Sequence, residues 1–205
     1  MSAKRGPREP GAAPTRAGLH EAALAYLARG AASAASVGKT LERRIAAWAR
    51  RSVRAGRDAE GVASDVARAR ELVPEIVARL REVGLVNDGA FAEMRAKRMS
   101  SSGRSRRAIA AHLAQKGVDA TTVREAVPQD AGAELGAALA FARKRRLGPF
   151  ARDEDAPADR DAKRELERKA LGALARAGFD FSVCERVMRM NRDDAEERLR
   201  ERREF

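Results

Sequence analysis

The sequence has few aromatic residues and a single cysteine. Phe, Trp and Tyr make up 4% of the 205 residues, although apolar residues together reach 44%. Much of that apolar content is alanine, which buries little surface per residue. The composition therefore argues against one large core and favours small helical bundles in series. The single cysteine, Cys184, excludes an internal disulfide and is typical of a protein kept in a reducing compartment.

Segments that would mark a membrane protein or a metalloenzyme are also missing. No apolar run is long enough for a membrane span or a signal peptide, so we expect a cytoplasmic protein with no membrane partner. The two histidines, His20 and His112, lie far apart, and no Cys/His cluster has metal-ligand spacing. Asn87-Asp88 and the acidic run 153–155 could supply metal ligands. The first is better explained as a helix cap, and the second as a linker. We expect no metal, no cofactor and no enzymatic activity.

Positive charge is in excess. The chain has 42 Lys and Arg residues against 30 Asp and Glu residues, which gives a formal net charge of +12 and a pI near 10.9. This excess predicts a polyanion or an acidic protein surface as the partner. The alternative is a highly charged helical surface that is simply solvated. Charge alone leaves both interpretations open.

The most informative stretch runs from residue 72 to 127. Apolar residues recur there at helical spacing and predict a helix that ends near residue 83 and three shorter helices after it. Gly84, Gly103 and Gly117 are placed to end helices in the left-handed conformation. Polar residues placed to cap the following helices are Asn87 or Asp88, Ser105, and Asp119 or Thr121.

The flanking sequence also predicts helices. The expected ranges are 18–29, 36–51, 60–83, 133–146, a helix that begins near 161, and 182–190. Pro74 either starts a new helix or bends a long one. Trp48 lies in an apolar stripe with Val37, Leu41 and Ile45, which favours a place in the core over stacking on a base.

Two segments of the chain repeat each other. RAIAAHLAQKGVDATTVREAV (107–127) aligns without gaps with RKALGALARAGFDFSVCERVM (168–188). Both read as helix, glycine stop, apolar residue, aspartate and short helix. We therefore predict an all-α protein made of tandem repeats of small three-helix bundles that form an elongated, curved body.

This organisation gives expected boundaries for the whole chain. Residues 1–17 form a disordered basic tail, 18–86 a first three-helix repeat with an insert, and 87–130 a second repeat. Residues 131–190 form a third repeat with a linker at 151–160, and 191–205 form a charged C-terminal tail.

The chain resembles the RecX regulatory family over most of its length. The resemblance is carried by ALAYLAR (23–29), LREVGLVNDGAFAE (80–93), GRSRRAIAAHLAQKGVD (103–119), ALAFARKRRLGPF (138–150) and ALARAGFDFSVCERVM (173–188). The departures lie mainly in the first repeat. An Ala/Arg-rich insert at about 49–70 replaces the usual helix and its Lys-Gly stop, and Asn87 stands where the family more often has an acidic residue.

The resemblance implies a regulator of the RecA recombinase. Such a protein binds in the groove of the RecA filament on single-stranded DNA, inhibits ATP hydrolysis and strand exchange, and modulates recombinational repair and the SOS response. A monomer is expected, with at most weak binding to bare DNA. Whether it caps filament ends or lies along the groove stays open.

Basic residues on the repeats are the candidate contacts, because the planar guanidinium of arginine binds phosphate or carboxylate in pairs. The candidates are Arg104, Arg106, Arg107 and Lys116 in the second repeat, Arg143, Lys144, Arg145 and Arg146 in the third, and Arg43 and Arg44 in the first. For each, the alternative is a solvated face residue. For 143–146, a favourable interaction with the helix macrodipole is a further alternative. The competing function is a general DNA-binding helical protein with an outline like a helix-turn-helix.

Overall fold

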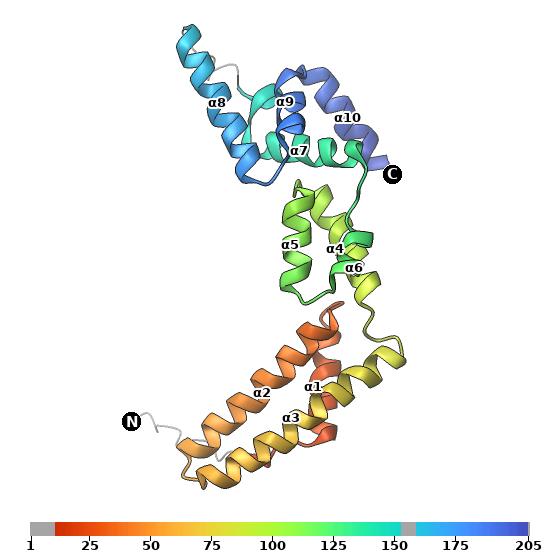
Figure 1. The fold of residues 1–205 in the computed structure, drawn as a ribbon, viewed down its shortest axis with the longest axis vertical. Helices are drawn as coiled ribbons and strands as arrows, with labels where there is room; N and C mark the ends of the chain where they lie inside the picture. Colours follow the sequence, from red (N-terminus) through yellow and green to blue (C-terminus); the bar gives the residue numbers. More distant parts are fainter. Residues whose placement is uncertain (1–10, 153–158, 205) are drawn as a thin grey trace, which may run out of the picture. The chain divides into compact units, whose positions relative to one another are not determined.

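The computed structural model describes residues 11–152 and 159–204, with side chains described up to residue 201. Within these ranges every regular element is helical (Figure 1). The all-α class and the tandem helical bundles predicted from the sequence are therefore confirmed. The chain divides into two compact units. The first runs up to Phe91 and includes 116–118, and the second holds 92–115 and the chain from 119 onward.

The first unit is built around a three-helix bundle of α1 (Arg16–Leu27), α2 (Ala34–Arg54) and α3 (Ala59–Glu82). The predicted stripe on α2 is buried, and Trp48 is 4% exposed. The core also draws on the other two helices, and its largest members are Leu19, Val37, Leu41, Ile45, Val73, Ile76 and Leu80. Figure 1 shows α2 and α3 side by side as a long hairpin.

The α3 helix settles the question that Pro74 leaves open. It runs unbroken from Ala59 to Glu82 with Pro74 inside it, so the proline does not start a new helix. Between α2 and α3 the chain turns at Gly56, whose φ is +84°. Asp58 then caps α3 by accepting a hydrogen bond from the Gly61 N–H at 2.6 Å.

Residues 1–10 of the predicted basic tail (1–17) lie outside the described part of the chain. Arg16 and Ala17 already belong to α1, and Thr15 caps this helix by accepting a hydrogen bond from Gly18 N–H at 3.2 Å. Trp48 Nε1 donates to the carbonyl of Gly11 at 2.9 Å and so fastens the chain just before α1.

The second bundle contains α4 (Asp88–Ser101), α5 (Arg106–Gln115) and α6 (Ala120–Ala126). Its predicted caps are confirmed. Asn87 Oδ1 accepts from Ala90 N–H at 2.9 Å, Ser105 Oγ from Ala108 N–H at 3.2 Å, and Asp119 from two N–H groups of α6. The buried apolar residues of this bundle are Phe91, Ala92, Ala96, Ile109, Leu113, Val118, Val123 and Val127.

The third bundle has more elements than the other two. It consists of α7 (Ala131–Arg145), the short 3-10 helix η1 (Gly148–Phe150), α8 (Arg160–Arg176), α9 (Phe181–Arg189) and α10 (Arg192–Glu204). Residues 153–158 of the predicted linker lie outside the described chain. Cys184 is buried in this core, as predicted, and burial raises the pKa of its thiol.

The last helix is more than a charged tail. Ala195 and Leu199 of α10 are 0% and 5% exposed and belong to the same core as Leu139 and Val187. The two apolar residues are four apart and share one face of the helix. The positions between and around these two residues are polar or charged. The composition of 191–205 therefore gives no sign of a buried face.

The repeat predicted from the sequence is visible in the structure and extends to the first bundle. Glycines with positive φ stand at 56, 117 and 178, a spacing of 61 residues in each case. Aspartates follow two residues later, at 58, 119 and 180, and each precedes the third helix of its bundle. The expectation that an insert replaces the helix and its glycine stop in the first repeat is therefore wrong. Instead, α2 and α3 are longer than their counterparts.

A pair of hydrogen bonds recurs where one bundle follows another. In the second unit, Ser105 Oγ donates to the Ala177 carbonyl at 2.7 Å, and Arg106 N–H donates to the Glu134 carboxylate at 3.0 Å. In the first unit, Ser33 Oγ donates to the Lys116 carbonyl at 2.6 Å. The next N–H, that of Ala34, donates to Asp88 Oδ1 at 2.8 Å. We call this pair of bonds the clasp.

Candidate nucleic-acid and partner interface

The second unit brings several predicted contact residues into one group. The turn between α4 and α5 lies directly on α7, since a Cβ on Gly103 would stand 2.7 Å from the Phe141 nitrogen. Lys144 Nζ crosses from α7 to donate to the Ser102 carbonyl at 2.8 Å. Arg104, the next residue but one, is therefore held near the last turn of α7.

We call the resulting group the basic cluster. It contains Arg104, Arg143, Lys144, Arg145 and Arg146, all of them exposed and none of them in an ion pair within the described chain. Arg145 also lies over the Phe141 ring, 5.8 Å from its centroid. Arg146 ends α7 in the left-handed conformation, with φ +55°. These cations also suit the negative end of the α7 dipole, and their exposed heads remain available to a partner.

The sequence around the cluster contains no acid. Residues 94–118 hold seven Lys and Arg residues and no Asp or Glu, and 135–152 hold five and none. Such runs place cations next to each other without the neighbouring carboxylates that would neutralise them. This arrangement raises the local positive potential and favours phosphate or carboxylate groups.

Arg106 has a different environment from the rest of its predicted group. It is half-buried, and its guanidinium lies 3.5 Å from Glu134 Oε2 and 3.5 Å from Asp180 Oδ2. It also donates to the Gln129 carbonyl at 3.1 Å. These contacts hold Arg106 in the clasp, so we leave it out of the basic cluster.

The remaining candidates lie elsewhere. Arg107 is exposed beside the turn between α8 and α9, where a Cβ on Gly178 would stand 3.4 Å from the Arg107 Cβ. Lys116 is half-buried, and its carbonyl accepts the clasp bond from Ser33. Arg43 and Arg44 are exposed on α2 of the first unit, and Arg43 donates to Thr40 Oγ1 at 3.1 Å.

Sequence reasoning missed several cations of the same kind. Lys97 and Arg98 are exposed on α4, within the first acid-free run, and Arg50, Arg51 and Arg54 are exposed on α2. The signal that would have found them is the absence of nearby acids. Between 39 and 57 the one acid is Glu42, and it is paired with Arg70 at 3.1 Å.

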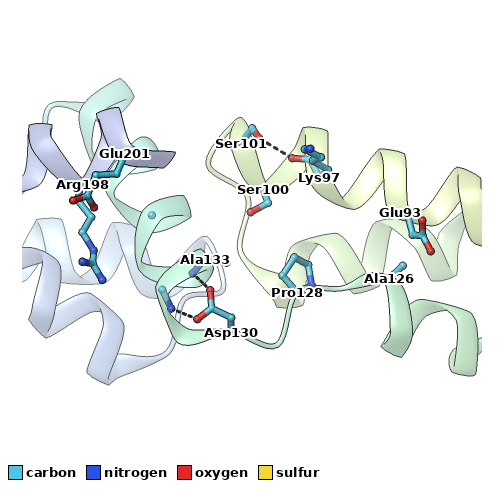
Figure 2. Close-up of a pocket in the computed structure, with 12 residues that line it drawn as sticks. Glu93, Lys97, Ser100, Ser101, Ala126, Pro128, Asp130, Ala133, Arg198 and Glu201 are labelled. Atoms are coloured by element: carbon cyan, nitrogen blue, oxygen red, sulfur yellow. Dashed lines mark hydrogen bonds between the residues drawn. The ribbon is translucent and has the colours of Figure 1, made fainter. Parts of the chain in front are cut away.

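A second feature of this unit is a cavity of about 610 Å³ between α4, the N-terminal half of α7 and α10 (Figure 2). Two of the polar residues that line it, Asp130 and Ser101, bond to backbone groups. Asp130 caps α7, as the dashed lines in Figure 2 show, by accepting from Gly132 and Ala133 N–H groups at 2.9 and 2.6 Å. These bonds lower the pKa of Asp130. Ser101 Oγ donates to the Lys97 carbonyl.

The described part of the chain has neither a metal-ligand cluster nor a helix able to span a membrane. Among the side chains described, those of residues 11–152 and 159–201, no three His, Cys, Asp or Glu come together as a metal site would require. Asn87, one of the possible metal ligands, acts as a helix cap, and residues 153–155 lie outside the described chain. Among the described helices, none has both the length and the apolar content needed to cross a bilayer.

Together these features define a modular, all-helical protein whose tandem three-helix bundles carry basic surfaces. Comparison with known proteins agrees with this class. Residues 87–127 match the family model for the second three-helix domain of RecX. A crystal structure of regulatory protein RecX superposes with a TM-score of 0.60 at 22% identity, covering 84% of this chain and 72% of that one, and so shares the fold.

Curated relatives extend the match along the chain. It is 39% identical over 194 residues to the regulatory protein RecX of Myxococcus xanthus, with 92% of each protein covered. It is 38% identical over 114 residues to the regulatory protein RecX of Agrobacterium fabrum, covering 56% of this chain and 57% of that one. The chain therefore belongs to the RecX regulatory protein family.

Proposed function

We propose that this protein binds the RecA recombinase filament on single-stranded DNA and inhibits its ATP hydrolysis and strand exchange, thereby modulating recombinational repair and the SOS response. Family membership supports a regulatory role. The observation that carries the proposal is the basic cluster, because it is exposed, lies in two acid-free runs of the sequence and is fixed in place by the packing of Gly103 on α7.

The modular construction suits such a partner. A filament repeats the same protein surfaces and DNA phosphates along its length, and each bundle can make a few weak contacts with it. Contacts made by linked modules reinforce each other, since the first one raises the effective concentration of the next. The arginine forks of the cluster supply paired hydrogen bonds to either type of anion.

The test compares two triple variants with the same change in charge. One neutralises Arg143, Lys144 and Arg145 to Gln, and the other neutralises Arg164, Arg168 and Lys169, which are paired with Asp161 and Glu165 on α8. We expect the first variant to need on the order of tenfold more protein for half-inhibition of the filament ATPase, equivalent to about 1.4 kcal/mol. The second should stay close to the unmodified protein. Equal effects would remove the basic cluster from the interface.

The acid-free runs also favour the competing function, general DNA binding without recombinase contact. The two functions differ in their dependence on salt. A duplex-binding protein would show a steep loss of affinity for bare DNA as salt rises, with a slope of about −0.9 for each phosphate contacted. A filament regulator would bind bare DNA loosely and act well below the amount that coats it.

A further inference from the structure

A cation-lined hollow in the first unit is separate from the basic cluster. It has a volume of about 470 Å³ and lies between the segment at 11–15, the first turn of α1 and one face of α2. We propose that this hollow is a binding site for a phosphate group, either in a nucleotide or in a nucleic-acid backbone. The proposal requires no recombinase, so it stands or falls apart from the proposed function.

The cationic wall comes from α2. Arg44 and Arg51 are seven residues apart, which places them on one face of the helix, two turns from each other. Ala47 lies between them and leaves space that a larger side chain would fill. Both arginines are exposed, and neither takes part in an ion pair within the described chain. Among the described residues that line the hollow, none is acidic.

The opposite wall is held in place by Trp48. Its indole Nε1 donates to the Gly11 carbonyl at 2.9 Å, which draws the segment before α1 across α2. Arg57 lies over the indole ring at 5.4 Å from the centroid and supports it from the α2–α3 turn. The hollow is thus formed by a fastened segment, and Leu19, which is fully buried, lines it from α1.

The N-terminal end of α1 adds to the positive potential in the hollow. Thr15 and Gly18 line the hollow, so the first turn of the helix borders it. The leading N–H groups of a helix have no acceptor within the helix and carry the positive end of its dipole. The first turn of α1 contains no acidic residue that would offset that charge. The Gly18 N–H is already bonded to Thr15 Oγ1, so the helix contributes the positive end of its dipole rather than a free donor. Two arginine forks border the same space, and a phosphate can accept hydrogen bonds from both of them.

The chain supplies its own probe for the test. Trp48 is the single tryptophan, so its fluorescence reports on the wall of the hollow. Inorganic phosphate, thymidine monophosphate and a short oligothymidylate are each titrated at constant ionic strength, with binding followed by Trp48 fluorescence and by calorimetry. The titrations are repeated with Arg44→Gln/Arg51→Gln. The matched control is Arg68→Gln/Arg79→Gln, which makes the same change in charge at two exposed arginines of α3 that are paired with Asp65 and Glu82.

We expect saturable binding that the Arg44/Arg51 variant weakens about tenfold or more, because each arginine contributes a charge-assisted hydrogen bond. The control should change it by less than about twofold. Saturation with phosphate or thymidine monophosphate would identify a site for free nucleotides. Saturation with the oligonucleotide alone would identify a site for backbone phosphate, and either result supports the proposal. Absence of binding in all three titrations, or equal weakening by both variants, would overturn it.

Discussion

Ser105 and Ala177 are joined by a hydrogen bond in which the serine hydroxyl donates to the backbone carbonyl at 2.7 Å. The same oxygen accepts from the Ala108 N–H and so caps α5. The hydroxyl therefore serves two elements at once, the start of one helix and the glycine turn of the following bundle. Ser33 has the same two roles, capping α2 and donating to the Lys116 carbonyl.

Replacing Ser105 with alanine should lower the stability of the second unit. The change removes a helix cap and leaves a carbonyl without its partner, so we expect a loss of about 2–4 kcal/mol in the free energy of unfolding. Urea denaturation followed by circular dichroism measures it. The control is Ser101→Ala, because that serine is exposed and its hydroxyl bonds within α4. A loss no larger than the control's would mean that the clasp contributes nothing.

Alanine substitutions at Gly84 and Gly103 distinguish the cost of a strained backbone conformation from the cost of a packing clash. Gly84 has φ +74° and open space where a Cβ would stand, so Gly84→Ala should cost about 1–2 kcal/mol from the left-handed conformation alone. Gly103 has φ +86°, and a Cβ there would also meet the Phe141 nitrogen at 2.7 Å. We expect Gly103→Ala to cost about 1–3 kcal/mol more, because the two backbones must separate. Equal losses in thermal unfolding would show that the α4–α5 turn does not pack on α7.

Glu134 should make stability depend on pH in a recognisable direction. Burial raises its pKa, an effect that exceeds the opposing influence of the Arg106 N–H and guanidinium and is reinforced by the Asp180 charge. The folded state then holds the proton more tightly than the unfolded state, and stability falls as pH rises from about 4.3, the ordinary pKa of Glu, through the raised value.

The matched variant is Glu134→Gln, which keeps an acceptor for the Arg106 N–H but does not titrate. The free energy of unfolding of each protein is measured by urea denaturation at a series of pH values. We expect the variant to gain stability relative to the unmodified protein as pH rises through this window. A difference that stays constant, or that changes in the opposite direction, would mean that the ion pair with Arg106 outweighs burial.

The last helix gives a further test of the core. Leu199→Ala should destabilise the second unit by about 2–5 kcal/mol, since Leu199 is 5% exposed and packs in the third bundle. Arg200→Ala, at a neighbouring exposed position, is the control and should change stability by about 0.5 kcal/mol or less. Thermal unfolding of both variants suffices. If Leu199→Ala left the stability unchanged, α10 would not contribute to the core and would be only a solvated tail.

Local patterns predict much of this fold because they act over a few residues. The apolar stripe that includes Trp48, the caps at Asn87 and Ser105, and the glycine stops at 103 and 117 can all be seen in the sequence and are all present. Each depends on helical spacing or on one backbone conformation. None of these features depends on which helix packs against it.

The features that escaped prediction depend on distant partners or on weak signals. The pairing of Arg106 with Glu134 and Asp180 needs α5, α7 and the α8–α9 turn in place, and no local pattern distinguishes it from the exposed Arg104. The glycine stop of the first bundle was missed because Arg57 stands where the other bundles have Val118 and Phe179. Its 61-residue spacing was nevertheless present in the sequence.

The most direct test of the proposed function is the ATPase rate of RecA filaments on single-stranded DNA as this protein is added, with its affinity for the same bare DNA measured at the same salt. The account predicts inhibition well below the amount of protein that coats the DNA. No inhibition, or inhibition only where the protein saturates the DNA, would contradict it and favour a general DNA-binding protein.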